Sequence, residues 1–309
     1  MTERIIRLLA RHLPGYAVRT VERLGEGQDN AAYEVNGELV VRQSKIGDSA
    51  PQSDSASQSD SAPHGHPAPH EDAAPRREAV RREAALLAVV SELSPLPVPR
   101  PVFVDEEAGV LAYRKLPGRP LNLHPVAEPS RLAAPLGGFL SRVHAAPVER
   151  MEALVSRDTY PMSELLEEAE EHFRDIAAHL PPAARRTVED FLGTAAPAEP
   201  VVLTFCHNDL GSEHLLVDVE ACALTGVIDW TDAAIADPAY DLALVYRDLG
   251  PDAYERTLAH YQGRHDDADH ERAVFYARCA LLEDVAYGLR TGARPYADAG
   301  LAHLDRTFS

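Results

Sequence analysis

The chain has 309 residues, a formal net charge of −19 and a pI of about 5.1. A protein this acidic repels phosphate backbones and anionic membranes, so we expect neither nucleic acid nor a membrane as a partner. A cationic small-molecule substrate fits the charge better, although acidity also serves solubility. The apolar runs all fall short of the ~18 residues that a membrane span needs.

The three cysteines, Cys206, Cys222 and Cys279, form no C-x-x-C unit and cannot all pair. Reduced thiols of this kind are typical of a cytoplasmic protein. The opening residues have no long apolar h-region, so they indicate an amphipathic helix rather than a signal peptide. We therefore expect a cytoplasmic protein, and the sequence does not indicate its oligomeric state.

The first part of the chain predicts a small sheet with one prominent helix. Apolar residues at helical spacing begin the chain, and Asn36-Gly37 between two β-like runs is a strong hairpin signal. The expected elements are a helix over 3–13, strands within 18–24, 31–35 and 38–43, a helix over 76–93, and strands within 95–105 and 109–121.

Residues 47–75 have a different composition from the sequence on either side. They are rich in Ser, Asp, Pro, Ala and His, and they contain almost no large apolar residue. Such a segment cannot bury enough surface to offset the entropy lost on ordering. We therefore expect a disordered insertion before the long helix.

From about residue 127 the chain is mainly helical. The expected helices lie within 129–147, 161–180, 184–194, 239–250, 253–262 and 272–290. Short strands and loops interrupt them between about residues 205 and 238. A sheet-rich first part and a helix-rich second part together predict an α+β fold with two lobes.

Two features of the first part point to phosphate binding. In the turn "GEGQDN", Gly25 and Gly27 would let the backbone approach a phosphate closely, but Asn30 stands where a G-x-G-x-x-G pattern has its third glycine. An ordinary hairpin turn is the alternative. Arg42 on a strand and Glu83 on the helix would pair to hold nucleotide phosphates, or they are two solvated surface charges.

The stretch "FCHNDLGSEHLLVD", residues 205–218, gathers titratable groups between two apolar flanks. Asp209 on a loop could orient or deprotonate an alcohol. Asp229 in "GVIDW", with His214 nearby, could hold Mg²⁺ against phosphate oxygens, although an imidazole suits Mn²⁺ or a water-bridged contact better. The alternative is that the two aspartates cap turns.

Together these motifs resemble a known family. "HNDLGSEH" is similar to the H-x-D-x-x-x-x-N catalytic loop, and "VIDW" to the D-F-G counterpart, of the aminoglycoside phosphotransferase family in the protein kinase-like superfamily. "DPAYDLA" and "LGGFLSRVHAAP" match two further runs of that family. His214 in place of the usual Asn, with "HND" and "GEGxDN", is closest to the 2″-aminoglycoside phosphotransferase branch. The resemblance covers nearly the whole chain outside 47–75.

The resemblance implies a bilobal protein kinase-like fold. A small β-rich, nucleotide-binding N-lobe would span 1–112, a hinge 113–116, and a larger, mainly helical C-lobe 117–309. ATP or GTP would be the phosphoryl donor, with Mg²⁺ as cofactor. The implied roles are acceptor orientation for Asp209, metal binding for His214 and Asp229, and nucleotide binding for Gly25, Gly27, Asn30, Arg42, Glu83, Tyr113 and Lys115.

The family's substrate site is lined with carboxylates that meet ammonium groups. Asp232 follows the metal loop, and Glu283 and Asp284 lie on a late helix, so all three are candidates, with solvated helix charges as the alternative. One departure is Arg247, which replaces an acidic residue of the 2″ branch and would repel a polyamine.

The resemblance implies an O-phosphotransferase acting on a hydroxyl group of a small molecule, with an aminoglycoside antibiotic as the expected acceptor, as in resistance enzymes. Three alternatives remain: a macrolide or another small alcohol as acceptor, a catalytically silent kinase-like module that binds nucleotide, and a metal-dependent hydrolase. The hydrolase lacks an H-x-H or H-E-x-x-H unit.

Overall fold

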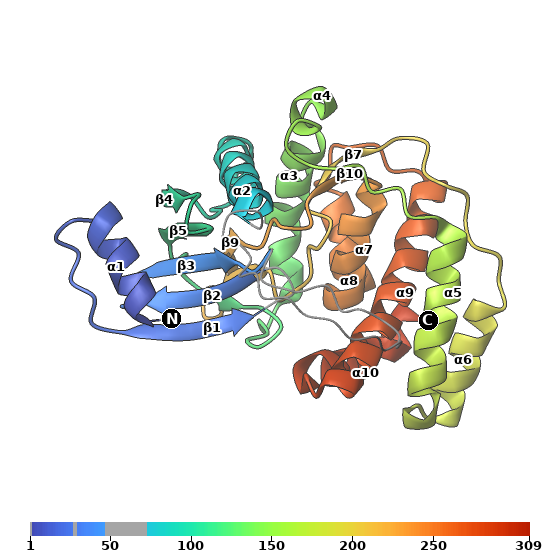
Figure 1. The fold of residues 1–309 in the computed structure, drawn as a ribbon. Helices are drawn as coiled ribbons and strands as arrows, with labels where there is room; N and C mark the ends of the chain where they lie inside the picture. The colour runs from blue at the N-terminus through green and yellow to red at the C-terminus, as the bar shows by residue number, and fades with distance from the viewer. Residues whose placement is uncertain (1, 27–29, 47–72) are drawn as a thin grey trace, which may run out of the picture. The chain divides into compact units, whose positions relative to one another are not determined.

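The computed structural model describes residues 2–26, 30–46 and 73–309. It divides into two compact units (Figure 1). The first comprises Met1–Ser91 and Pro99–Lys115, and the second comprises Glu92–Val98 and Leu116–Ser309. Within the described ranges, no helix is long and apolar enough to cross a membrane.

The first unit contains a five-stranded antiparallel sheet in the order β1-β2-β3-β5-β4. The Asn36-Gly37 turn joins β2 to β3, and both residues adopt the left-handed φ that this hairpin requires. The elements are α1 (Thr2–His12), β1 (Val21–Glu26), β2 (Asn30–Val35), β3 (Leu39–Ser44), α2 (Ala73–Leu93), β4 (Pro101–Asp105) and β5 (Val110–Arg114).

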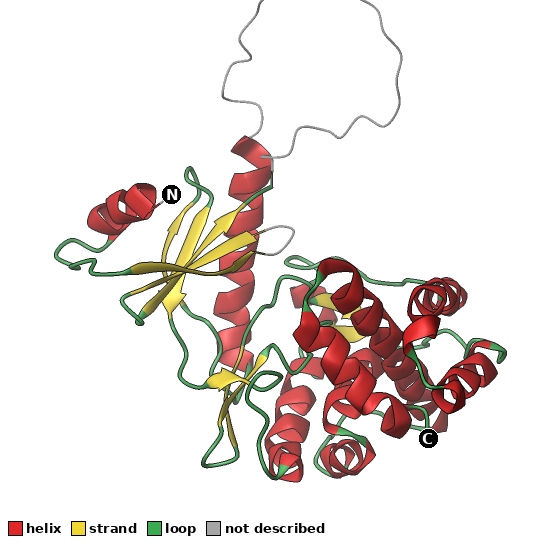
Figure 2. Ribbon diagram, turned by 90° about the horizontal axis from the view of Figure 1, so that it is seen from below, coloured by secondary structure: helices red, strands yellow, loops and turns green. Residues whose placement is uncertain are grey.

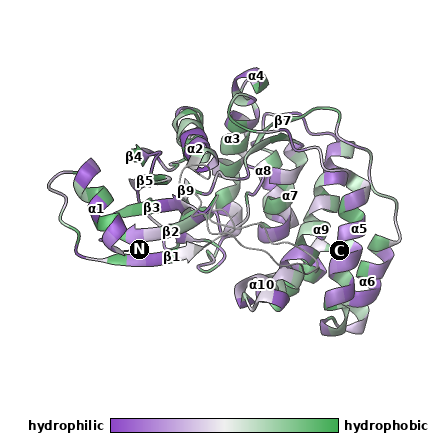
Figure 3. Cartoon of the chain, viewed as in Figure 1, coloured by the Kyte–Doolittle hydropathy of each residue, from purple (hydrophilic) through white to green (hydrophobic). Residues whose placement is uncertain are grey.

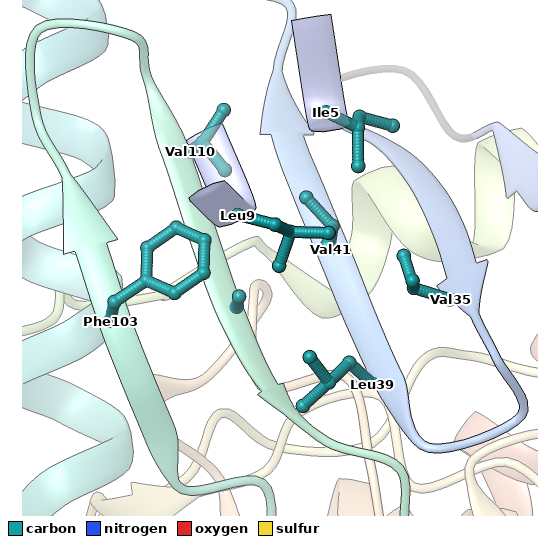
Figure 4. Packing of buried hydrophobic residues seen from close by; sticks show 8 residues of the cluster. Ile5, Leu9, Val35, Leu39, Val41, Phe103 and Val110 are labelled. Carbon is teal, nitrogen blue, oxygen red and sulfur yellow. The ribbon is translucent and has the colours of Figure 1, made fainter. Parts of the chain in front are cut away.

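The two faces of this sheet pack against different helices (Figure 2). Ile5 and Leu9 of α1 pack on one face, in a cluster of buried side chains that includes Val35, Leu39 and Val41 (Figure 4). Because side chains alternate along a strand, the neighbours of Leu39 and Val41 on β3 point to the opposite face, where α2 lies. This alternation directs Arg42 toward α2.

The second unit is mainly helical (Figure 1). Helix α9 is its longest described helix and packs against α5, α7 and α10. In Figure 3 the helices carry hydrophilic and hydrophobic stretches side by side, as amphipathic helices do. The helices are α3 (Ala133–His144), α4 (Val148–Met151), α5 (Met162–Ile176), α6 (Pro182–Leu192), α7 (Pro238–Leu249), α8 (Pro251–Leu258), α9 (Asp267–Thr291) and α10 (Arg294–Thr307), with 3₁₀ turns at Pro129–Leu132 and Ala177–His179.

Two small sheets of this unit carry the loops 207–214 and 228–233. Strands β7 (Thr204–Cys206) and β10 (Ala234–Ala236) pair antiparallel, while β6 (Arg119–Pro120), β8 (Leu215–Asp218) and β9 (Ala223–Val227) form a three-stranded sheet. Residues 207–214 connect β7 to β8, and we call them the catalytic loop after the role expected for Asp209. Residues 228–233 connect β9 to β10, and we call them the metal loop after the role expected for Asp229.

The structure agrees with most expected elements but differs at the short helix α4, which was not expected, at α10 and at the start of α2. Helix α10 was not expected, although Gly292 at a left-handed φ ends α9 and Pro295 stands in the first turn of α10, both of which are boundary signals. Helix α2 begins at Ala73, so the end of the expected 47–75 insertion is helical. The rest of that insertion lies outside the described residues.

Candidate active site

The catalytic loop is anchored at its start by Asp241 on α7. The Asp241 carboxylate accepts hydrogen bonds from the backbone N–H groups of His207, at 2.9 Å, and Asn208, at 2.8 Å. Asn208 adopts a left-handed φ of 62°, which Asn tolerates better than most residues. Asp241 is fully buried, so these bonds give its charge the partners that a buried carboxylate needs.

A buried histidine supplies the third partner of Asp241. His144, at the end of α3, donates from Nε2 to Asp241 Oδ2 over 3.0 Å, and its Nδ1 lies 2.8 Å from the hydroxyl of Tyr261. Burial raises the pKa of a carboxylate, yet the hydrogen bonds and charges of His144 and His207 together outweigh it and keep the pKa of Asp241 below its usual range. The histidine of the "LGGFLSRVHAAP" run therefore supports the catalytic loop from behind.

His207 connects the catalytic loop to the metal loop. Its Nε2 donates to the carbonyl oxygen of Ile228 over 3.0 Å, while the Ile228 N–H donates to the carbonyl of His214. Burial lowers the pKa of His207 to about 4, so the ring is neutral at physiological pH. Asp229, the next residue, has a left-handed φ of 59°, and its carboxylate accepts a hydrogen bond from the Thr231 hydroxyl.

Asp209, Glu213 and His214 bring their side chains together at the end of the catalytic loop. One potential ligand atom from each lies within 4.8 Å of the others. His214 donates from Nδ1 to the carbonyl oxygen of Asp209 over 2.7 Å, and the same nitrogen lies 3.3 Å from Oδ2 of the Asp209 carboxylate. Burial disfavours the charged form of His214, yet the carboxylates of Asp209 and Glu213 outweigh it and raise its pKa.

Asp209 itself is partly accessible, with 39% of its side chain exposed. Burial of the remainder raises its pKa to about 6, and the carboxylates of Glu213 and Asp232 add to the effect. A carboxylate of this kind is ionised at neutral pH and is a better proton acceptor than an ordinary aspartate.

This cluster of three carries a donor set that suits a divalent cation. Carboxylate oxygens are what Mg²⁺ prefers, and a neutral imidazole is a common ligand of softer divalent metals. The residues therefore fit a metal ion at this end of the loop, with Glu213 as a potential ligand that sequence reasoning missed. Its position next to His214 was the available signal.

Asp209 also lines a cavity of about 860 Å³ in the helical unit. Its described lining holds six carboxylates and not one Lys, Arg or His. Aromatic rings from α7, α9 and the loop before α5 complete the wall. The carboxylates are those of Asp158, Glu199, Asp209, Asp232, Asp237 and Glu283, and the rings are those of Tyr160, Tyr240 and Tyr276.

Of the three residues expected to bind substrate, only two line this cavity. Asp232 and Glu283 line the cavity with Asp209, whereas Asp284 is not among its lining residues. The Asp284 carboxylate lies 2.9 Å from Nη1 of Arg247 instead. Sequence reasoning missed Asp158 and Glu199, which lie in irregular segments without a recognisable motif.

Arg247 does not present the free cation that the sequence suggested, and that expectation was wrong. Only 8% of its side chain is exposed, and its guanidinium forms ion pairs with Asp248 and Asp284. Burial opposes the charge, but these two carboxylates raise the pKa of Arg247 well above its usual value. Because its charge is compensated within the fold, Arg247 is no barrier to a cationic substrate.

In the first unit, the structure brings Arg42 and Glu83 together. Nη1 of Arg42 lies 3.1 Å from Oε1 of Glu83, and the two side chains are only 10% and 15% exposed. Gly25 lies at a shift in the β1–β2 register, and a Cβ added there would meet no described atom within 4 Å. Asn30 begins β2 opposite Ser44. Gly27 lies outside the described residues.

The segment expected to act as a hinge, 113–116, begins within β5 and continues past its end. Tyr113 is buried and paired with Val40 of β3. Lys115 donates its backbone N–H to the carbonyl of Glu38 over 2.8 Å, and its ammonium group pairs with Glu34. The Lys115 N–H is therefore used within the sheet, so a backbone contact with a purine would come from another group of this segment.

Comparison with known proteins identifies the family to which this sequence is related. The model of a phosphotransferase enzyme family matches residues 20–276. An aminoglycoside 3′-phosphotransferase of Streptomyces fradiae is 28% identical over 198 residues, which are 59% of this chain and 71% of that protein. A viomycin phosphotransferase of Streptomyces vinaceus is 26% identical over 192 residues, which are 60% of this chain and 66% of that protein.

Solved structures share the fold over nearly the whole chain. The GDP and kanamycin complex of APH(2″)-IIIa aligns with a TM-score of 0.67 at 21% identity, covering 98% of both chains. A macrolide 2′-phosphotransferase type I aligns with a TM-score of 0.59 at 18% identity, covering 98% of this chain and 96% of that one. The expected α+β fold, with a β-rich N-terminal unit and a mainly helical C-terminal unit, is confirmed.

Proposed function

The chain belongs to the phosphotransferase enzyme family, and we propose that it transfers the γ-phosphoryl group of ATP or GTP to a hydroxyl group of an aminoglycoside antibiotic. The observation that carries this proposal is the position of Asp209, at the wall of a cavity lined by carboxylates. Among the described residues, the cavity is lined by six acidic side chains and no basic one, and Asp237 is the member that pairs with a buried arginine, Arg272. Such a lining attracts a substrate with several ammonium groups. Aminoglycosides combine such groups with many hydroxyls.

Asp209 has the features of the residue that orients and deprotonates the acceptor. Its carboxylate is partly exposed to the cavity, while the backbone beside it is held by Asp241. The acceptor oxygen would attack the γ-phosphorus as the bond to the β–γ bridging oxygen breaks, and Asp209 would take the hydroxyl proton. Most of the rate enhancement in such transfers comes from positioning and charge stabilisation.

Asp229 and His214 remain the predicted Mg²⁺ ligands, and Glu213, which clusters with His214 and Asp209, would be an additional one; Asp229 is not part of that cluster. The ion would neutralise charge on the transferred phosphoryl group. His207 keeps the two loops that carry these ligands in register through its bond to Ile228. The bond from His214 Nδ1 to the Asp209 carbonyl orients the imidazole.

The first unit would bind the nucleotide. Arg42, held by Glu83, carries a permanent charge for phosphate oxygens, and Gly25 and Gly27 would let the backbone approach them. Asn30, Tyr113 and Lys115 remain predicted nucleotide contacts. We also propose a cytoplasmic location, where nucleoside triphosphates are available.

The test is nucleotide turnover with Mg²⁺, with ATP and GTP assayed separately against aminoglycosides, viomycin, macrolides and simple amino alcohols. We expect turnover that depends on an aminoglycoside, and we expect Asp209→Asn to abolish it while nucleotide binding stays within about threefold. Turnover with macrolides alone would replace the acceptor class. Nucleotide binding without turnover against any acceptor, or full activity of Asp209→Asn, would contradict the proposal.

A further inference from the structure

Helix α7 binds the catalytic loop at two places. At its first turn, Asp241 accepts hydrogen bonds from the N–H groups of His207 and Asn208, as described above. Near its end, Asp248 accepts a hydrogen bond through Oδ2 from the backbone N–H of Ser212, over 2.6 Å. Asp209 lies between the two anchored segments.

The spacing of the two carboxylates explains how one helix reaches both sides of the loop. Residues seven apart are separated by about two turns of an α-helix and project from the same face. Asp241 and Asp248 have this spacing, so α7 presents both carboxylates to the same loop. Asn122 adds a smaller contact by donating its N–H to the carbonyl of Ser212 over 3.2 Å.

We propose that Asp248 is a positioning residue for Asp209, because it fixes the far side of the catalytic loop as Asp241 fixes the near side. This inference rests on the proposed phosphotransferase function. Asp248 does not line the cavity, and it acts through the backbone of Ser212.

Arg247 holds the Asp248 carboxylate in place. Its Nε lies 2.7 Å from Asp248 Oδ1 and its Nη2 lies 3.1 Å from Oδ2, so the guanidinium contacts both oxygens. Its remaining arm reaches Asp284 on α9. A buried carboxylate without such a partner would be costly, and Arg provides a fork that Lys cannot reproduce. Arg247 thus keeps Asp248 charged and correctly oriented.

Helix α10 supports the same end of α7. Arg306 donates from Nη2 to the carbonyl oxygens of Arg247, at 3.2 Å, and Asp248, at 2.5 Å. Carbonyls in the last turn of a helix have no partner within it, so this contact satisfies two of them. The C-terminal helix is thereby connected to the catalytic loop through the backbone of α7.

The first experiment measures steady-state phosphoryl transfer by Asp248→Asn, Arg247→Lys and the double variant, each assayed well below its Tm. We expect each single change to lower kcat about 10- to 100-fold, because a small misplacement of a reacting group costs that much. Both KM values should change less than about threefold. The double variant should be no slower than Asp248→Asn, because Arg247 acts through Asp248.

The matched control is Asp105→Asn in the first unit, which also alters a buried carboxylate that accepts a backbone hydrogen bond, here from the N–H of Ala108 over 2.9 Å. It should lower Tm while kcat stays within twofold of the wild-type value. If Asp248→Asn behaves in the same way, Asp248 serves stability only and the proposal is overturned.

Hydrogen exchange supplies a readout that is independent of turnover. In Asp248→Asn, exchange should become faster in peptides covering 209–213 and remain unchanged in peptides covering 204–208, which Asp241 still holds. Unchanged exchange in 209–213 would refute the anchor. A wild-type protein without acceptor-dependent turnover would contradict the proposed function, and exchange would still decide the role of Asp248.

Discussion

The His207 imidazole joins two loops through one hydrogen bond, from its Nε2 to the carbonyl oxygen of Ile228. The ring is fully buried, and its Nδ1 has no hydrogen-bond partner among the described residues. Burial therefore lowers its pKa to about 4, against an unfolded value of about 6.5. The neutral ring belongs to the folded state, and protonation favours the unfolded one.

From this shift we predict a loss of stability in acid. As pH falls from about 6.5 to 4, the unfolded chain binds a proton that the folded chain does not, which costs on the order of 3 kcal/mol in total. Urea unfolding at several pH values, compared with His207→Gln, isolates the effect. The stability difference between the two proteins should shrink or reverse toward pH 4. A constant difference would show that His207 is not the titrating group.

The buried contacts of Asp241 predict a second stability effect. Asp241→Asn places an amide N–H₂ beside backbone N–H donors, so at least one buried donor loses its acceptor, at a cost of about 1–3 kcal/mol. Denaturant unfolding measures this loss. Asp298→Asn, which breaks an exposed pair with Arg294, is the control and should change stability by less than about 0.5 kcal/mol. Equal effects would argue against the anchoring role of Asp241.

The acidic cavity predicts an effect on acceptor binding. Glu283→Gln removes one carboxylate of the lining, and a charge-assisted contact with an ammonium group is worth about a factor of ten in affinity. We expect the acceptor KM to rise about tenfold while the nucleotide KM stays constant. Glu171→Gln, on the exposed side of α5, should leave both unchanged. A rise in the nucleotide KM alone would place Glu283 elsewhere in the reaction.

The Arg42–Glu83 pair predicts the reverse pattern. Arg42→Lys retains the charge but loses the planar fork that pairs with Glu83 and would contact phosphate oxygens under the proposed function, so the nucleotide KM should rise about tenfold. The acceptor KM should not change. Arg81→Lys, in an exposed pair with Glu106, is the control for a similar arginine nearby. If both variants retain the wild-type nucleotide KM, Arg42 serves only to hold α2 on the sheet.

Local sequence patterns were sufficient for many elements of the fold. The Asn36-Gly37 hairpin depends on backbone preferences of two adjacent residues, and α1 depends on apolar spacing within a few turns. The catalytic loop was recognisable for the same reason, since Asp209 and His214 lie five residues apart in one motif. Such patterns involve residues close together in the sequence, so they can be recognised without information on the tertiary structure.

The sequence by itself therefore determined the fold class and predicted which residues form the candidate site. Only the tertiary structure decided which charges meet. The sequence predicted that Arg247 would repel a cationic substrate, but the structure shows that its charge is paired with Asp284 of another helix. Glu283 and Asp284 are adjacent in the chain, yet only one lines the cavity. Side chains on successive helical positions diverge by about 100°, so their partners depend on packing between helices that no local pattern encodes.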